Sequence, residues 1–508
     1  MSLVNEFLER GILVDPELLK LLKDINTPII VDILQQIEPK KFISKKAFLD
    51  NLDKITLILN NLKDNQKEGE EREIIRKTLA SLSVITKKEV VEGEGKAKVL
   101  KSWIVPSRKI TVDDFVKYFQ NRFIELKSII QERNDIENLT TINKVSSQKQ
   151  NIAIIGMVNK KRITKNKNVI LELEDLTGKI SVLVSCTKEE LSKKVKDVVL
   201  DEVIAVKCSG NNEILFANDI IFPNIFNEKR KIKNEEYAVF TSDVHVGSVK
   251  FLEENFIKFI KWINGEVGNE QQKELSQKIK YLFLTGDNVD GVGVYPGQEE
   301  VLYINDVRLQ YARLAELLKQ IRKDITIFMC PGQHDAERIA EPQPAIDRKY
   351  AEKLYELENL ILVSNPALVE IGATKEGPGF KVLMYHGASL LNFVDDIEEL
   401  RLNKAIKTPT KIVKYCLTKR HLSPQHNSSD YLPVKEGDPF VIREVPDVVA
   451  TGDCHRSDVS IYNNVLMIAS SCWQSTTPFE EKVGHEPDPC KVPILNLKTG
   501  NVNILDFS

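Results

Sequence analysis

Five short apolar runs in the second half of the chain each give way to a polar loop that begins with a carboxylate, an amide or a histidine. The runs cover residues 237–242, 281–285, 325–330, 380–385 and 448–451. Continuous apolar runs of this length are typical of strands that are buried on both faces. Because ligand groups collect at the carboxyl ends of parallel strands, we expect the polar residues after these runs to meet at one place.

The first part of the chain shows helical spacing. Residues 1–60 carry apolar residues at intervals of three and four, which predicts a small N-terminal helical domain. Residues 61–145 are rich in charge and predict a linker that contains one helix over 111–131. Thr111 and the acidic residues that follow it are typical of a helix start.

The spacing of apolar residues changes between residues 146 and 228, where apolar and polar positions alternate and predict five short strands. A helix-like segment around residues 188–194 lies between the third and the fourth strand. This order predicts an OB-fold β-barrel. Its first hairpin is basic, with Lys160, Lys161, Arg162, Lys165 and Lys167. The hairpin has three open interpretations: a contact with single-stranded nucleic acid, a merely solvated turn, or part of a protein docking module.

The composition describes a multidomain α+β protein without a membrane segment. The chain has 508 residues, and a charged connector at 227–236 leads into a last domain over 235–508. The net charge of −3 gives no general attraction to nucleic acid. We find no apolar run of eighteen residues and no leader at the start. The seven cysteines form no C-x-x-C pair, which indicates reduced thiols and a cytoplasmic location.

The polar residues after the five runs form a candidate metal site. In chain order the candidate ligands are Asp243, His245, Asp287, Gln333, His386, Asp453 and His455. Asp and His without Cys favour manganese, iron or zinc. Asp-x-His places two side chains on one side of an extended strand end, and the lone Asp287 can bridge two ions. Two ions about 3.5–4 Å apart would clamp both oxygens of a phosphoryl displacement. His334, next to Asp335, suits a group that protonates the leaving oxygen or stabilises the transition state.

These motifs carry a family resemblance. Asp-x-His, Gly-Asp-Asn, Gly-Gln-His-Asp, His-Gly and Gly-Asp-x-His resemble the five motifs of the calcineurin-like metallophosphoesterases. The strings over residues 285–298 and 331–344 resemble, more specifically, the small-subunit family of the archaeal family-D DNA polymerases. The resemblance covers the predicted OB block and the whole C-terminal domain. It implies that this domain is a β-sandwich flanked by helices.

The resemblance also implies a function. It implies a Mn²⁺-dependent 3′→5′ exonuclease, with Mg²⁺ or Fe²⁺ as alternative ions, that proofreads DNA and is bound to a large polymerase subunit. A sliding clamp is a further candidate partner, and the nucleoid is the expected location. By motif position, the first ion would be held by Asp243, His245, Asp287 and His455. The second would be held by Asp287, Gln333, His386 and Asp453, with His334 as the catalytic residue and Asp335 beside it.

Two positions depart from the superfamily pattern, and both fall on the second ion. Gln333 stands where Asn is usual, and Asp453 stands where the first His of Gly-His-x-His is usual. Both still offer an oxygen donor, and the added carboxylate favours hard Mn²⁺ over zinc. We therefore expect an altered site that is still active. The alternative is a non-catalytic scaffold subunit with a degenerate second site. A phosphoprotein phosphatase or a free-standing repair nuclease is a weaker alternative, because the OB block and residues 341–344 argue against both.

Overall fold

The structure is a computed structural model of the 508-residue chain. It describes residues 13–14, 42–43, 96–104, 109–146, 149–228, 230, 232–374, 377–426, 428–434 and 437–508. The chain divides into two compact units, residues 1–93 with 106–108 and residues 94–105 with 109–508. In the first unit β1 (Leu13–Val14) and β2 (Phe42–Ile43) pair in parallel. The predicted helices of residues 1–60 lie outside the described residues.

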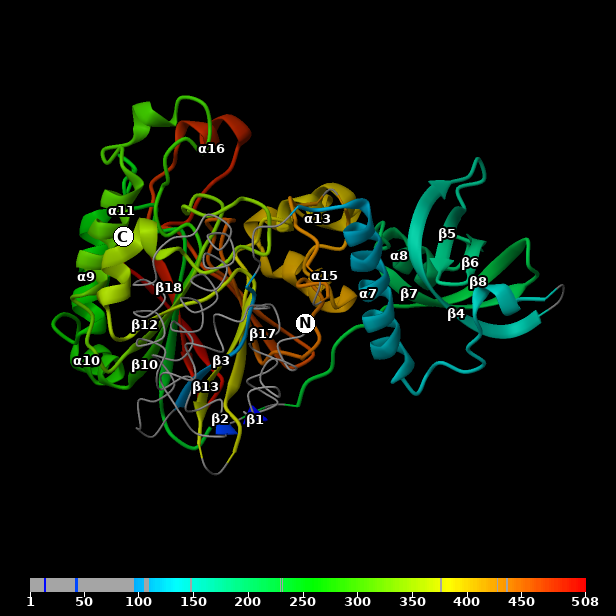
Figure 1. The fold of residues 1–508 in the computed structure, drawn as a ribbon, viewed down its shortest axis with the longest axis horizontal. Helices are drawn as coiled ribbons and strands as arrows, with labels where there is room; N and C mark the ends of the chain where they lie inside the picture. Colours follow the sequence, from blue (N-terminus) through cyan, green and yellow to red (C-terminus); the bar gives the residue numbers. More distant parts are fainter. Residues whose placement is uncertain are drawn as a thin grey trace. The chain divides into compact units, whose positions relative to one another are not determined.

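The second unit has a mixed α+β fold with two six-stranded sheets (Figure 1). The first sheet has the order β12-β11-β10-β9-β18-β19. Its strands are β9 (Tyr237–Thr241), β10 (Ile279–Thr285), β11 (Thr326–Cys330), β12 (Leu360–Leu362), β18 (Lys491–Asn496) and β19 (Val502–Asp506). Strands β9 to β12 run in parallel, so their carboxyl ends share one edge.

The second sheet has the order β16-β17-β15-β14-β13-β3. Its strands are β3 (Lys96–Ser102), β13 (Ala367–Ala373), β14 (Phe380–Met384), β15 (Val448–Thr451), β16 (Asp458–Tyr462) and β17 (Val465–Ala469). Strands β14, β15 and β17 are parallel. The five apolar runs of the sequence are thus strands β9, β10 and β11 of one sheet and β14 and β15 of the other.

The two sheets pack face to face around one hydrophobic core. Phe240, Phe283 and Phe328 of the first sheet share this core with Val382 and Ile468 of the second, and all five are buried. Helices cover the outer faces (Figure 1). The α-helices described after β9 are α9 (Glu253–Ile263), α10 (Glu270–Gln277), α11 (Val307–Leu318), α12 (Arg348–Ala351), α13 (Leu390–Asp396), α14 (Glu398–Leu402), α15 (Thr410–Lys419) and α16 (Pro478–Val483). Of these, α13, α14 and α15 share a hydrophobic core with the second sheet.

The block predicted to hold five strands is a closed five-stranded barrel with the order β4-β5-β6-β8-β7. Its strands are β4 (Lys149–Ile163), β5 (Val169–Asp175), β6 (Gly178–Val184), β7 (Val203–Gly210) and β8 (Ile214–Ile221). Helix α8 (Glu189–Lys196) lies between the third and fourth strands, where the sequence predicts it. No helix in the described part of the chain combines the length and the apolar character needed to span a bilayer.

The described part of the predicted linker contains a strand that the sequence did not reveal. Strand β3, within residues 61–145, pairs with β13 at the edge of the second sheet. Its sequence, Lys-Ala-Lys-Val-Leu-Lys-Ser, is rich in lysine, which natural edge strands use to prevent pairing with other chains. Residues 96–102 of the predicted linker thus form an edge strand, and residues 61–95 lie outside the described residues.

Helix α7 (Val112–Gln131) is the helix predicted over 111–131. The backbone N–H and the hydroxyl of Thr111 both donate to the Asp114 carboxylate, at 2.8 and 2.9 Å. The helix packs against the barrel, since Phe123, Leu126 and Ile130 share a core with β4 and β7.

A buried ion pair connects α7 to the segment before β15. Arg122 Nε lies 2.6 Å from Asp438 Oδ2, and both side chains are buried. The hydroxyl of Tyr118 donates to Asp438 Oδ1 at 2.8 Å, and His421 Nε2 lies 2.9 Å from Oδ2. Burial alone would raise the pKa of Asp438, but Arg122 and His421 hold it below its ordinary value.

We expect Asp438→Asn to lower the free energy of unfolding by about 3–5 kcal/mol, because it leaves the buried Arg122 guanidinium without a counter-charge. Denaturant unfolding followed by circular dichroism measures this change. Lys193→Ala, which breaks the exposed pair of Lys193 with Glu189, is the control and should leave the midpoint unchanged. Equal midpoints for Asp438→Asn and the unmodified chain would contradict a stabilising role for the pair.

Candidate metal centre

Five of the seven predicted ligands have a left-handed backbone. The φ angles are 51° at Asp243, 53° at His245, 47° at Asp287, 64° at Asp453 and 49° at His455. Residues other than glycine rarely adopt this conformation, and such residues cluster at functional sites. The sequence argument for Asp-x-His assumed an extended strand end. The two side chains do reach one site, but they do so because the chain turns sharply at each of them after β9 has ended.

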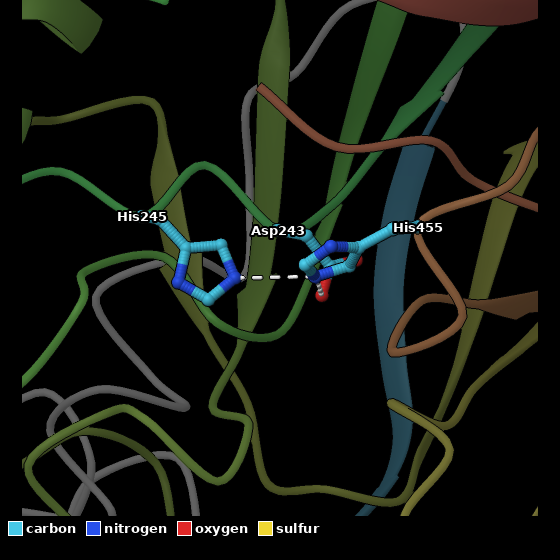
Figure 2. A group of neighbouring side chains, drawn as sticks. All are labelled: Asp243, His245 and His455. Atoms are coloured by element: carbon cyan, nitrogen blue, oxygen red, sulfur yellow. Dashed lines mark hydrogen bonds and ion pairs between the residues drawn. The ribbon is translucent and has the colours of Figure 1, made fainter. Parts of the chain in front are cut away.

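Asp243, His245 and His455 form the first group of donors (Figure 2). His245 Nε2 lies 3.3 Å from His455 Nε2, and His455 Nε2 lies 3.4 Å from Asp243 Oδ1. Asp287 Oδ2 is 4.0 Å from His245 Nε2. All four residues predicted for the first ion are therefore close together, with their donor atoms pointing at one another.

The residues predicted for the second ion form a neighbouring group. His386 Nε2 lies 3.3 Å from Asp287 Oδ2 and 3.9 Å from Asp453 Oδ1. Gln333 Nε2 lies 3.2 Å from Asp453 Oδ1. Oδ2 of Asp287 faces a histidine of each group, which is the position that a bridging carboxylate needs.

Oxygen acceptors on the outer side orient the three histidines of the two groups. The Nδ1 contacts are His245 with Asp290 Oδ1 at 3.0 Å, His455 with Glu480 Oε1 at 2.8 Å and His386 with the Thr285 carbonyl oxygen at 2.8 Å. Each of these oxygens can accept a hydrogen bond from the Nδ1–H group, and the Nε2 lone pair of the same ring is then available to an ion. Asp290 and Glu480 are parts of this group that the sequence alone did not single out. Asp290 lies within the Gly-Asp-Asn-Val-Asp string, and Thr477 with Glu480 forms a capping box at α16, so both positions carried a signal.

The residues at the second group fit a cation. His386 Nε2 and Gln333 Oε1 are buried and have no hydrogen-bond partner among the described residues. Buried polar atoms are nearly always paired, so two unpaired atoms in one group indicate a missing partner. Burial by itself lowers the pKa of His386, but Asp287, Asp243 and Asp453 raise it well above its ordinary value. The carboxylates thus favour positive charge here, and the oxygen and nitrogen donors suit a divalent ion such as Mn²⁺.

Two glycines let the backbone approach the ligands. A Cβ on Gly332 would lie 2.2 Å from Asp287 Oδ1, and one on Gly452 would lie 2.6 Å from Asp243 Oδ2. Any side chain at these positions would displace a carboxylate. The donor groups are therefore held in a space that the loops leave open for them.

His334 lies at the edge of both groups. Its backbone N–H donates to Asp287 Oδ1 at 2.9 Å, and its Nδ1 lies 2.8 Å from the Asp290 carbonyl oxygen. Its ring centroid is 4.8 Å from that of His245. The side chain is thus fixed beside the donors, with Nε2 opposite the anchored nitrogen.

The Asp335 carboxylate, which follows His334 in the chain, hydrogen-bonds to other groups than the His334 ring among the described residues. Its Oδ2 accepts hydrogen bonds from the backbone N–H groups of Asn288 and Gly332 at 3.1 and 2.9 Å, and its Oδ1 accepts from the Tyr311 hydroxyl at 2.8 Å. Burial, together with Asp287, raises the pKa of Asp335 to about 6. Asp335 therefore connects the loop after β10, which holds Asn288, to the loop after β11, which holds Gly332.

The basic hairpin of the barrel divides into two kinds of residue. Lys161 Nζ donates to the carbonyl oxygens of Lys196 and Val198 at 3.0 and 2.7 Å, so this lysine stabilises the barrel. Lys160 Nζ lies 3.3 Å from Glu172. The remaining three, Arg162, Lys165 and Lys167, are exposed.

Comparisons with known proteins show the family of the chain. Residues 238–459 match the family of B subunits of DNA polymerases alpha and epsilon. The chain is 39% identical over 398 residues to the DNA polymerase II small subunit of Methanothermobacter thermautotrophicus, which covers 78% of this chain and 80% of that protein. It is 33% identical over 500 residues to the protein of the same name from Archaeoglobus fulgidus, covering 97% of this chain and 95% of that one.

Two further matches are less complete. The Pyrococcus furiosus DNA polymerase II small subunit is 37% identical over 407 residues, covering 79% of this chain but only 64% of that protein. A solved structure described as a novel archaeal phosphodiesterase covers 53% of this chain and 98% of its own, at 15% identity and a TM-score of 0.26. A likeness at that level supports no conclusion about fold or function. The matches to the Methanothermobacter and Archaeoglobus proteins show the family, and the chain belongs to the family of archaeal DNA polymerase II small subunits.

Proposed function

We propose that this chain is the 3′→5′ exonuclease subunit of a replicative DNA polymerase and proofreads single-stranded or mismatched 3′ ends. The observation that carries the proposal is the meeting of seven oxygen and nitrogen donors at one edge of the sandwich, two of them buried and unpaired. The sandwich would be its metallophosphoesterase domain. The 3′→5′ direction follows from the family resemblance.

The residues of the site have separable tasks. Divalent ions bound here would supply Lewis acidity and would lower the pKa of a bound water molecule towards neutral pH. Asp287 would serve both ions, and the outer acceptors Asp290 and Glu480 would keep the histidines in the binding tautomer. His334, anchored through Nδ1, would give a proton from Nε2 to the leaving oxygen of the phosphodiester.

The other parts of the chain would bring the site to its substrate. The name of the relatives implies a catalytic large subunit as the partner in the cytoplasm. We infer an OB-fold for the barrel (146–228), a helical domain over 1–60, a charged linker with a helix over 61–145, in which β3 and α7 lie, and the nuclease domain over 235–508. Arg162, Lys165 and Lys167 would contact the phosphates of a single strand, since they are exposed.

A non-catalytic scaffold is the second candidate, and one contact favours it. Gln333 Nε2 lies 3.2 Å from Asp453 Oδ1, so the two unusual residues of the second group can satisfy each other without an ion. Against it, Gln333 Oε1 and His386 Nε2 are left without partners by that contact. Release of nucleotides from a single-stranded 3′ end by the purified chain with Mn²⁺ separates the two candidates.

We expect Asp243→Ala and His245→Ala each to lower the rate of nucleotide release by more than about 100-fold. The reason is that each removes a donor from the first group, and ion-based charge stabilisation is worth several kcal/mol. The measurement is digestion of 3′-labelled and 5′-labelled single strands, with thermal unfolding to check the fold. His426→Ala, at an exposed histidine outside the centre, is the control and should keep full activity. Near-normal rates in either ligand variant would refute the site assignment.

His334→Ala should keep both ions and lose rate on the order of 10²–10⁴-fold, the usual worth of a positioned proton donor. Metal content by mass spectrometry and single-turnover digestion test this together. Loss of an ion from His334→Ala would make His334 a ligand and disprove its role as the acid.

Metal preference tests the second group. We expect strong activity with Mn²⁺, weaker activity with Mg²⁺, which demands near-ideal octahedral geometry, and little with Zn²⁺. Asp453→His should shift the preference towards softer ions without abolishing cleavage, because an imidazole replaces an anionic oxygen. Metal titrations of both proteins on one single-stranded substrate provide the comparison. Equal or better activity of the unmodified chain with Zn²⁺ than with Mn²⁺ would contradict the preference of the second group for hard ions.

A further inference from the structure

A cavity of about 500 Å³ opens next to the metal centre. The loop after β10, the loop after β11 and the start of α12 line it, and the lining includes Gln333 and His334. The volume falls in the range of small-molecule sites. Gln333 and His334 border both the cavity and the donor groups. A part of the substrate that binds in the cavity could therefore be directly attached to the phosphodiester that reacts at the metal centre.

The walls of the cavity combine apolar side chains with polar and charged ones. Val292 and Ile339 are 47% and 53% exposed, so they lie at the solvent-open mouth of the cavity. A single strand of nucleic acid could leave the cavity through this mouth. Tyr350 of α12 also lines the cavity, and Lys349 Nζ lies 4.5 Å from the centroid of its ring. A tyrosine ring in such a place can stack on a nucleobase of any sequence.

The charges of the cavity suit an uncharged occupant. The Arg338 guanidinium donates to two backbone carbonyls of its own loop, and Lys349 Nζ lies 3.7 Å from the Asp347 carboxylate. Glu337 is partly buried and accepts a hydrogen bond from the Asp347 N–H at 2.8 Å, and burial raises its pKa to about 7. These side chains leave little to attract a phosphate. The phosphate of a substrate belongs with the metal centre, and a sugar with its base belongs in the cavity.

The place of His334 decides which nucleoside this is. In the proposed reaction a water oxygen bonds to phosphorus, the bond from phosphorus to the 3′ oxygen breaks, and that oxygen takes the proton of His334. The cavity lies on the side of His334, which is therefore the side of the leaving oxygen. We propose that the cavity binds the nucleoside that carries the leaving oxygen, with Tyr350 stacked on its base. For a 3′→5′ exonuclease that releases 5′-mononucleotides, this is the penultimate nucleoside, and the inference rests on that proposed function.

The test uses the full chain with Mn²⁺ and three single strands: one unmodified, one with an abasic penultimate residue and one with an abasic terminal residue. For the unmodified chain, the penultimate abasic residue should lower kcat/KM by roughly 5- to 150-fold, the worth of one stacked base. The terminal abasic residue should have a smaller effect. Tyr350→Ala should show the same loss on the unmodified strand and no further loss on the penultimate abasic strand.

Two control variants frame this result. Tyr350→Phe keeps the ring and should behave as the unmodified chain does. Tyr303→Ala removes an exposed tyrosine that does not line the cavity, and it should keep the full discrimination. Equal rates of the unmodified chain on the unmodified and penultimate abasic strands, a larger loss at the terminal position, or full discrimination by Tyr350→Ala would each overturn the inference.

A substrate without a nucleoside separates this inference from the proposed function. Bis(4-nitrophenyl) phosphate needs the metal centre but carries no nucleoside, so the unmodified chain and Tyr303→Ala should both cleave it. Cleavage of this diester without any discrimination between the strands overturns the cavity assignment alone. Cleavage of neither the diester nor the strands by the unmodified chain overturns the proposed function and the inference with it.

Discussion

Carboxylate crowding at one edge of the sandwich is the constraint on which the site depends. Asp243, Asp287 and Asp453 are brought together in a region where Asp243 and Asp287 are almost fully buried. The backbone N–H of Asp453 lies 3.2 Å from Asp243 Oδ2, so even the main chain is directed at these charges. Like charges in a buried place are costly unless a cation offsets them. Protonated histidines or divalent ions can do so, and an ion would also give Gln333 Oε1 a partner.

The surrounding loops hold this arrangement through a hydrogen-bonded brace made by residues 341–344 and the segment before β13. Gln343 Nε2 donates to the Gly332 carbonyl oxygen at 2.8 Å, and Asn365 Nδ2 donates to Gln343 Oε1 at 2.9 Å. Asn365 Oδ1 in turn accepts from the His386 backbone N–H at 2.9 Å. The brace therefore connects a loop of the first sheet to a ligand that follows a strand of the second. Burial raises the pKa of Glu341, which accepts from the same Asn365 amide, to about 8.

The second unit combines parts with different tasks. The sandwich positions the donors, because parallel strands of both sheets end at the same edge. The barrel has its own hydrophobic core, to which Ile154, Leu171 and Val206 belong. Helix α7 contacts the barrel through apolar residues and reaches Asp438 through Arg122. An apolar contact on one side and a buried ion pair on the other give this helix a defined place between the two.

Much of the site and of the order of elements could be predicted from the sequence, because both depend on local patterns. Apolar runs that end in Asp, Gln or His located the strands β9, β10, β11, β14 and β15 and every predicted ligand. Alternation and a single helical segment located the five barrel strands and α8. Short-range rules suffice here, because a continuous apolar run indicates a strand buried on both faces and an alternating one indicates a strand buried on one face.

Tertiary structure alone decided the rest, because the deciding contacts join residues far apart in the chain. Lysine-rich β3 resembles a linker until β13 provides an edge to pair with. Asp335 resembles a partner of His334 until Asn288, Gly332 and Tyr311 take up its carboxylate. Asp290 and Glu480 become functional only because their oxygens meet the outer nitrogens of His245 and His455. A sequence names the chemical groups, but burial and distance between remote segments determine which of them touch.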